Sequence, residues 1–80
     1  MINIDSLSKE EIELLMRYAT CNMSMRQTSA ATYYDKRTIA KKLLQISNKT
    51  KMNVWRFWDL HDLMNELEKA GRLKHGEHSR

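Results

Sequence analysis

The chain has 80 residues, one cysteine and a formal net charge of +4, so it forms at most one small domain and no internal disulfide. No apolar run reaches the roughly 20 residues needed to cross a bilayer, and residues 1–11 show neither the basic nor the apolar region of a secretory signal. We therefore expect a soluble, cytoplasmic protein with no membrane partner.

Positive charge is concentrated in the middle of the chain. Residues 24–56 carry eight Lys and Arg against one acid, Asp35, whereas residues 1–23 and 57–80 carry net charges of −2 and −1. A field of this sign attracts a polyanion and gains from counterion release. The alternative is a solvated lysine face without a partner.

The first predicted helix covers about 9–19. Ser8 followed by Glu11 has the spacing of a capping box, and Leu7 before the cap has the spacing of a hydrophobic staple with Ile12. Its apolar residues recur at helical spacing, which predicts one buried face: Ile12, Leu15, Met16 and Ala19. The pattern breaks at 20–23, where we expect a loop.

A short second helix is predicted from Met25 to Thr32. Ser24 followed by Gln27 forms another capping-box pattern. The run from Thr28 to Thr32 has only small side chains, which let a neighbouring helix approach closely. The alternative is a weak polar helix on the surface.

A third helix is predicted over 36–46, after a turn at Tyr33 and Tyr34. Asp35 is a favourable cap for it. Apolar side chains at i, i+4 and i+7 are expected to face the core, and basic side chains occupy the opposite face. Cations near a helix amino terminus oppose the helix dipole, and a locally unfavourable arrangement often marks function. The residues concerned are Ile39, Leu43 and Ile46 on one face and Lys36, Arg37, Ala40, Lys41 and Gln45 on the other, with Lys42 beside them.

The remainder of the chain is predicted to close the core. Residues 47–51 form a polar linker, and the aromatic stretch 52–58 is expected to pack beneath the helices, with base stacking by an exposed ring as the alternative. Asp59 is the expected cap of a last helix, with Trp58 packing onto Leu63. The apolar stripe of this helix and its stop follow the usual pattern: Leu60, Leu63, Met64 and Leu67, then Gly71.

The stretch QTSAATYYDKRTIAKKLLQI (27–46) is similar to a family pattern, Q-T-A-x-x-L-Y-I-H-R-N-T-L-x-Y-R-L-x-x-I. Through it, residues 24–67 resemble the carboxy-terminal helix-turn-helix DNA-binding domain of PucR-type and sugar-diacid-type bacterial transcription regulators. The matching residues are Gln27, Thr28, Tyr33, Thr38, Leu43 and Ile46, continued by Thr50, Met52, Val54, Phe57, Asp59 and Leu60.

The resemblance implies a transcription regulator that reads double-stranded DNA. The chain departs from the family where residues 35–38 (DKRT) replace H-R-N-T, so no target sequence carries over, and where Thr32 replaces a core leucine. Since the motif begins near the start of the chain, we expect a stand-alone reader without a sensor domain, of a phage or mobile-element kind.

Together these patterns predict an all-α fold: a compact bundle of about four helices containing a helix-turn-helix over 1–71, followed by a flexible basic tail, 72–80. We expect sequence-specific binding of double-stranded DNA, with helix 36–46 in the major groove and a homodimer on two half-sites. Arg37 and Lys41 are expected to meet base edges and Lys36 and Thr38 bases or phosphates. The expected phosphate contacts come from Ser24, Arg26, Lys42, Lys49 and Lys51.

Other activities are either alternatives or not expected. One alternative is a helix-turn-helix-derived protein-binding module, such as a phage-type inhibitor that grips an acidic protein partner. Another is an architectural or recombination-directionality factor that bends DNA. We expect no enzymatic activity, cofactor or metal, because both glycines lie beyond residue 70 and His75 and His78 have no second close pair of Cys or His to complete a site.

Overall fold

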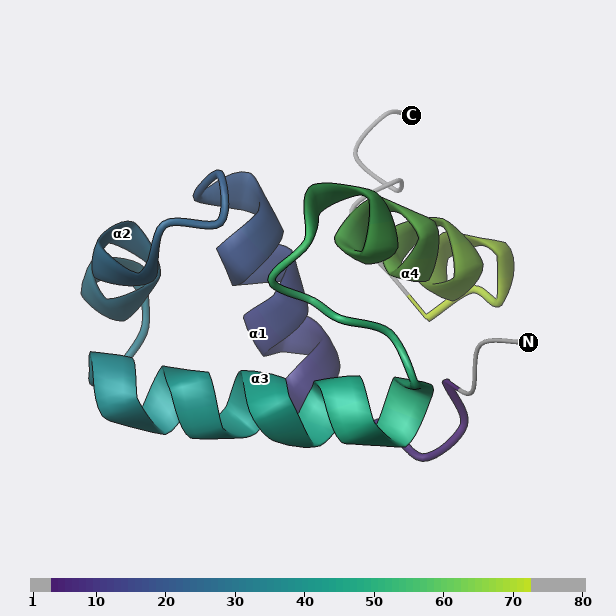
Figure 1. The fold of residues 1–80 in the computed structure, drawn as a ribbon, viewed down its shortest axis with the longest axis horizontal. Helices are drawn as coiled ribbons and strands as arrows, with labels where there is room; N and C mark the ends of the chain where they lie inside the picture. Colours follow the sequence, from purple (N-terminus) through teal and green to yellow (C-terminus); the bar gives the residue numbers. More distant parts are fainter. Residues whose placement is uncertain (1–3, 73–80) are drawn as a thin grey trace.

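The computed structural model describes residues 4–72, and within them every regular element is a helix. This confirms the predicted all-α class. None of the helices in the described part combines the length and the apolar character needed to span a membrane. The elements, shown in Figure 1, are α1 (Lys9–Thr20), α2 (Met25–Ala31), α3 (Lys36–Thr50) and α4 (Phe57–Lys69).

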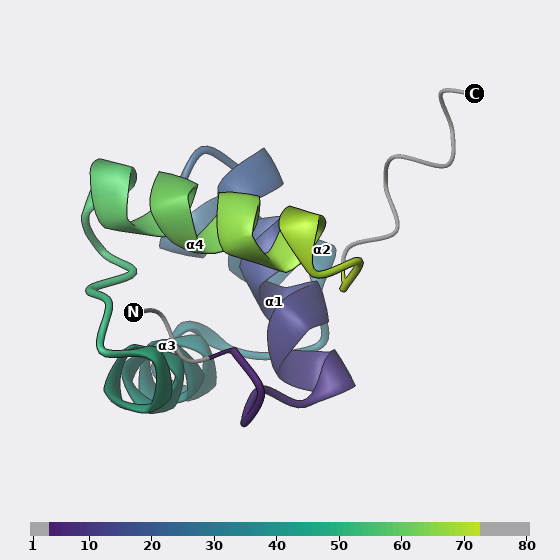
Figure 2. The same cartoon turned by 90° about the vertical axis from the view of Figure 1, so that its right-hand side faces the viewer.

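The four helices surround one core. In Figures 1 and 2, α3 runs along the lower edge, α2 lies over its amino-terminal end, and α4 lies on the upper side with α1 reaching between them. The core takes side chains from α1, α3 and α4, and Leu15, Leu43 and Leu63 are each 0% exposed. The apolar stripes predicted for these three helices therefore face the core, with Met16, Ala19 and Met64 half-buried.

The predicted caps of α1 and α3 are present. The Glu11 N–H donates to Ser8 Oγ over 3.1 Å, and the Glu11 carboxylate accepts from the Ser8 N–H over 2.8 Å, which completes the capping box. At α3, Asp35 Oδ1 accepts from the Thr38 N–H over 2.8 Å. These bonds satisfy backbone donors that a helix leaves unpaired at its start.

Helix α2 packs where its side chains are smallest. Thr28 is fully buried, and its hydroxyl donates to the Ser24 carbonyl over 2.7 Å. The Ser29 hydroxyl donates to the Tyr34 carbonyl over 2.9 Å, which ties α2 to the turn that follows it. Small residues thus let α2 lie close to α3, although Ala30 and Ala31 themselves are exposed.

The predicted end of α3 at Ile46 is wrong, because the helix continues to Thr50. Residues 47–50 are therefore helical and do not form the predicted linker. The buried Thr50 hydroxyl donates to the Ile46 carbonyl over 2.7 Å, and Ser47 Oγ accepts from the Val54 N–H over 3.2 Å. Lys51 then ends the helix with φ 62°. Hydrogen bonds between polar side chains and the backbone therefore support the last turn of α3. The polar composition of residues 47–51 does not by itself indicate a helix.

The expected packing of the aromatic stretch beneath the helices is also wrong. Val54 is fully buried, but Trp55, Phe57 and Trp58 are 42%, 57% and 69% exposed. Phe57 lies three positions before Leu60 and shares its side of the helix, but it is the first residue of α4, where it lines a pocket together with Leu60 and His61. Trp58 projects outward because it lies two positions before Leu60, on a different face of α4. Trp58 consequently does not form the expected staple onto Leu63.

Helix α4 begins at Phe57, two residues before the predicted cap. Asp59 is therefore inside the helix, and its Oδ2 accepts from the Asn53 N–H over 3.0 Å. Arg56 occupies the cap position without a side-chain bond to the helix. Asp59 thus fastens the preceding loop to α4 instead of starting the helix.

Gly71 ends α4, as predicted, in the left-handed region with φ 73°. The Gly71 N–H donates to the Glu68 carbonyl over 3.0 Å and the Arg72 N–H to the Leu67 carbonyl over 2.9 Å, the pattern of a Schellman motif. The Arg72 guanidinium donates to the carbonyls of Ile4 and Leu7 over 3.1 and 2.9 Å. The first residue of the predicted tail thereby joins the two ends of the domain, and residues 73–80 lie outside the described part.

Candidate nucleic-acid interface

Helix α3 presents three exposed cations along its amino-terminal half, Lys36, Arg37 and Lys41, which we call the cationic face of α3. The side of the helix opposite Arg37 and Lys41 is fixed in the core by Ile39 and Leu43, both 0% exposed, and Lys36 is the first residue of α3. In Figures 1 and 2 no other helix lies outside α3 at the lower edge of the molecule. The fold therefore turns these cations toward solvent.

Little within the described residues neutralises the cationic face. Within residues 4–72, Lys36, Arg37 and Lys41 take part in no ion pair, and α3 contains no acidic residue. Asp35 is the nearest acid in sequence, and hydrogen bonds from Thr38 lower the pKa of its carboxyl. Its charge offsets part of the unfavourable effect of cations at the start of a helix.

The turn before α3 adds two tyrosines with different surroundings. Tyr34 packs against the core, and Lys42 Nζ lies 5.1 Å from the centre of its ring, a cation–π contact that holds Lys42 beside the turn. Tyr33 is fully exposed, at 106% of its reference area. The sequence places this residue in the turn without indicating its exposure. Its phenol lies next to the amino terminus of α3, where its hydroxyl could donate a hydrogen bond to a phosphate.

The predicted DNA-contacting residues of α2 and of the first turn of α3 differ in their exposure. Arg26 is exposed at the start of α2, and Ser24 is half-buried, with Oγ accepting from the Gln27 N–H over 3.1 Å. Thr38 is half-buried, because it lies between the exposed cations and the core-facing Ile39. Ser24 and Thr38 thus have structural roles beside any contact with a ligand.

Lys49, predicted to contact phosphate, has a different partner. Its Nζ lies 3.0 Å from both carboxylate oxygens of Glu11 and 3.4 Å from the Ser6 carbonyl. This ion pair joins α3 to the start of α1, so Lys49 is engaged within the fold and does not belong to the candidate interface. Lys51 is exposed at the carboxy end of α3, roughly 22 Å along the helix from Lys36 at 1.5 Å per residue.

The Glu11 carboxylate connects the capping box with this ion pair and is 8% exposed. Burial raises the pKa of Glu11, but the hydrogen bond from the Ser8 backbone and the interactions with Lys49 together outweigh it and leave the pKa below its usual 4.5. A carboxyl whose pKa is lowered by folding stabilises the fold above its unfolded pKa. That contribution is lost as the pH falls through the lower, folded pKa.

The stability supplied by Glu11 is therefore expected to disappear in acid. Glu11→Gln should be less stable than wild type by about 1–3 kcal/mol near neutral pH, because hydrogen bonds to a charged group are lost. The difference should shrink as the pH falls below the unfolded value of 4.5. Urea unfolding at a series of pH values measures it, with the exposed Glu13→Gln as the matched control. A difference between Glu11→Gln and wild type that is independent of pH would contradict this role.

No protein-family model, curated protein or solved structure matches the chain. The cationic face of α3 combines three exposed cations that take part in no ion pair within residues 4–72 with a side at Ile39 and Leu43 that is fully buried.

Proposed function

We propose that the chain binds double-stranded DNA in a sequence-specific way, as a regulator of transcription, with α3 in the major groove. The observation that carries this proposal is the exposure of Lys36, Arg37 and Lys41 in the amino-terminal half of α3, without an acidic partner in residues 4–72. An α-helix about 10–12 Å across fits a major groove about 12 Å wide. The resemblance of 24–67 to a helix-turn-helix family favours the same function.

Arg37 and Lys41 are the proposed base-reading residues. They stand four positions apart, so their side chains leave the same side of α3 about one turn from each other. Arginine and lysine both donate to the O6 and N7 acceptors of guanine in the major groove. Lys36 and Thr38, beside them at the helix start, would meet a base or a phosphate.

Phosphate contacts on both sides of the groove would hold α3 in place. Such contacts fix the orientation of the protein without reading sequence. Since one reading helix covers only a few base pairs, we propose that two copies bind two half-sites. The side chains assigned to phosphate are Ser24, Arg26, Tyr33, Lys42 and Lys51.

Selection from a pool of random duplexes, followed by titration of the selected duplex at several salt concentrations, tests the function. Affinity should fall steeply with salt, with log K changing by about −0.9 per phosphate neutralised for each unit of log salt concentration. A selected duplex should also bind more tightly than a random one. Failure to bind any duplex at low salt would reject DNA binding and favour an acidic protein as the partner.

Arg37→Ala separates base reading from general attraction. On the selected duplex it should cost about 1–3 kcal/mol of binding free energy and relax the preference at one base pair. Arg26→Ala, which removes the same charge from a proposed phosphate contact, should weaken selected and random duplexes alike. Fluorescence anisotropy measures both variants on both duplexes. An equal loss on both duplexes for Arg37→Ala would refute its assignment to a base.

A further inference from the structure

A cluster of exposed rings belongs to the amino end of α4, and Figure 1 shows this end of the helix on the side of the molecule away from α3. Phe57 and Trp58 meet edge to face at 4.9 Å between ring centres, and Trp58 meets His61 at 5.6 Å. Phe57 and Trp58 are 57% and 69% exposed. Contiguous apolar surface with a polar rim is typical of an interaction site. We call Phe57, Trp58 and His61 the α4 patch.

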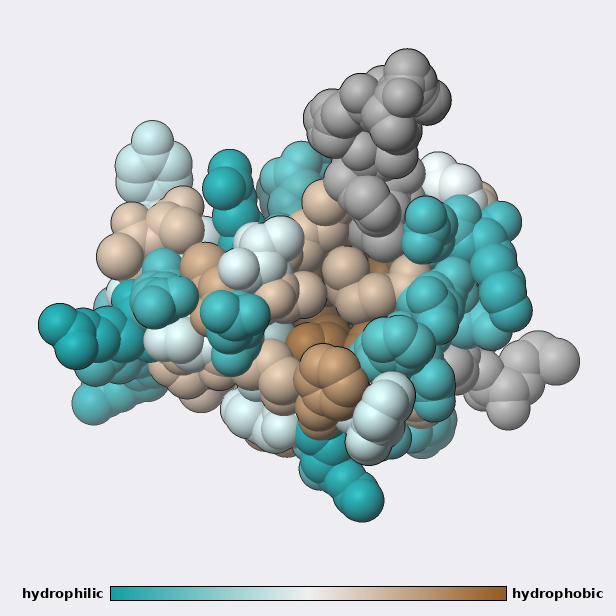
Figure 3. All heavy atoms as spheres, turned by 90° about the horizontal axis from the view of Figure 1, so that it is seen from above, coloured by the Kyte–Doolittle hydropathy of each residue, from teal (hydrophilic) through white to brown (hydrophobic). Residues whose placement is uncertain are grey.

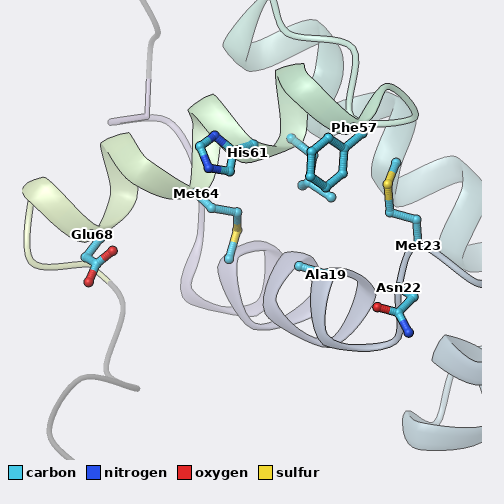
Figure 4. A pocket seen from close by; sticks show the side chains of 8 residues that line it. Ala19, Asn22, Met23, Phe57, His61, Met64 and Glu68 are labelled. Atoms are coloured by element: carbon cyan, nitrogen blue, oxygen red, sulfur yellow. The ribbon is translucent and has the colours of Figure 1, made fainter. Parts of the chain in front are cut away.

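An apolar hollow of about 440 Å³ adjoins the α4 patch. In Figure 4, Phe57 and Met64 extend from α4 toward Ala19 of α1 and Met23 of the following loop, and His61 lies beside Phe57 on α4. Figure 3 shows apolar side chains gathered around a hollow on this face. A volume in this range accommodates a drug-sized molecule, so it has room for a projecting aromatic side chain. A protruding ring and a hollow that fits a ring thus stand side by side.

We propose that the α4 patch joins two copies of this chain about a twofold axis beside Trp58. A twofold interface brings the same surface of each copy together, so the surface must complement itself. The α4 helices of the two copies would run antiparallel, and positions equally far from residue 59 would face each other. Phe57 would then meet the partner's His61, and each Trp58 would lie near the hollow of the other copy.

The charges beside the patch favour a second copy as its occupant. Arg56 is exposed before Phe57, and Asp62 is exposed after His61. Arg56 forms no ion pair within the described residues, and Asp62 has only His61, at 3.8 Å. Because 56 and 62 are equally far from residue 59, the antiparallel arrangement places each arginine opposite the other copy's aspartate. The cation and the anion of each copy would both gain a partner.

The composition of the patch also suits the centre of a dimer interface. Stable interfaces have an apolar, aromatic centre with a polar rim. They cover about 800 Å² per partner, which is about one seventh of the 5573 Å² of solvent-accessible surface on this chain. The rings and the hollow would supply the centre, and Arg56 and Asp62 the rim. Since α4 lies away from α3 in Figures 1 and 2, such a dimer leaves both cationic faces free.

Sedimentation equilibrium of the full chain without DNA tests the proposal over concentrations up to about 1 mM. Wild type should self-associate, and Trp58→Ala should raise the dimer dissociation constant at least about tenfold, as expected for an aromatic residue at an interface centre. Trp55→Ala, the matched change at the other exposed tryptophan, should leave it within about threefold, as expected outside the centre. Circular dichroism should show that both variants keep their helices.

Charge exchange gives a second, independent test. Arg56→Asp and Asp62→Arg should each weaken the dimer, because each places like charges opposite each other. The double variant should recover association to within about threefold of wild type, since both pairs re-form with reversed signs. A double variant as weak as the single ones would overturn the antiparallel arrangement and with it the proposal.

The dimer proposal and the DNA proposal fail separately. A wild-type chain that stays monomeric at every concentration, or a Trp58→Ala variant that associates as well as wild type, overturns the dimer and assigns the α4 patch to a different protein. Neither result changes the response of DNA affinity to Arg37→Ala. Conversely, a dimer that binds no duplex supports this surface while rejecting the proposed function.

Discussion

Leu43→Ala is expected to destabilise the domain enough to unfold much of the population at physiological temperature. Leu43 is 0% exposed on the core side of α3, and removing a buried leucine side chain costs about 3–5 kcal/mol, including the cavity left behind. A stability of roughly 0.05–0.15 kcal/mol per residue leaves a small domain little reserve. The midpoint of thermal unfolding, followed by circular dichroism, should fall by about 15–30 °C.

Leu44→Ala is the matched control for this substitution. Leu44 is the adjacent residue of the same helix but is 52% exposed, so the same truncation there should change stability by less than about 1 kcal/mol. The contrast tests the rotation of α3, since a helix turned by one residue would exchange the two effects. A midpoint for Leu43→Ala within a few degrees of wild type would show that α3 faces the core with another side.

Replacement of Lys36, Arg37 and Lys41 by glutamine should abolish recognition of a selected duplex. The two proposed base contacts alone account for about 1–3 kcal/mol each, and each lost phosphate neutralisation removes further affinity at low salt. Together they predict a loss of at least about a thousandfold. The fold should persist, because all three side chains are exposed and none takes part in an ion pair within residues 4–72.

A second triple variant has the same net charge as the first but keeps the cationic face of α3. Lys9, Arg17 and Lys69 are also exposed but belong to α1 and α4, and changing them to glutamine lowers the net charge from +4 to +1 in the same way. This variant should keep most of its affinity for the selected duplex. If both triple variants lose affinity equally, net charge alone attracts DNA, and α3 has no special role.

Much of the candidate site could be predicted from local patterns. The core-facing Ile39, Leu43 and Ile46 recur at helical spacing, and this spacing places Arg37 and Lys41 on the opposite side. Lys36 lies three positions before Ile39, in line with the core-facing stripe, and is exposed as the first residue of α3. The structure shows these exposures as expected. Lys49 belongs to the same basic stretch, but its partner Glu11 is 38 positions away in sequence, so no local pattern reveals their ion pair. Likewise, nothing near Tyr33 indicates that it is fully exposed while Tyr34 packs on the core.

By itself, the sequence determined where α1 and α3 begin, which side of each is buried and where α4 ends. These features depend on caps, apolar spacing and a glycine that act within one or two turns. Only the tertiary structure decided that α3 continues to Thr50 and that Asp59 holds the preceding loop instead of capping α4. It also decided that Phe57 and Trp58 remain outside the core. Each of these outcomes depends on which groups, distant in sequence, the packed helices bring within reach of one another. The neighbouring residues do not indicate hydrogen bonds or burial that arise in this way.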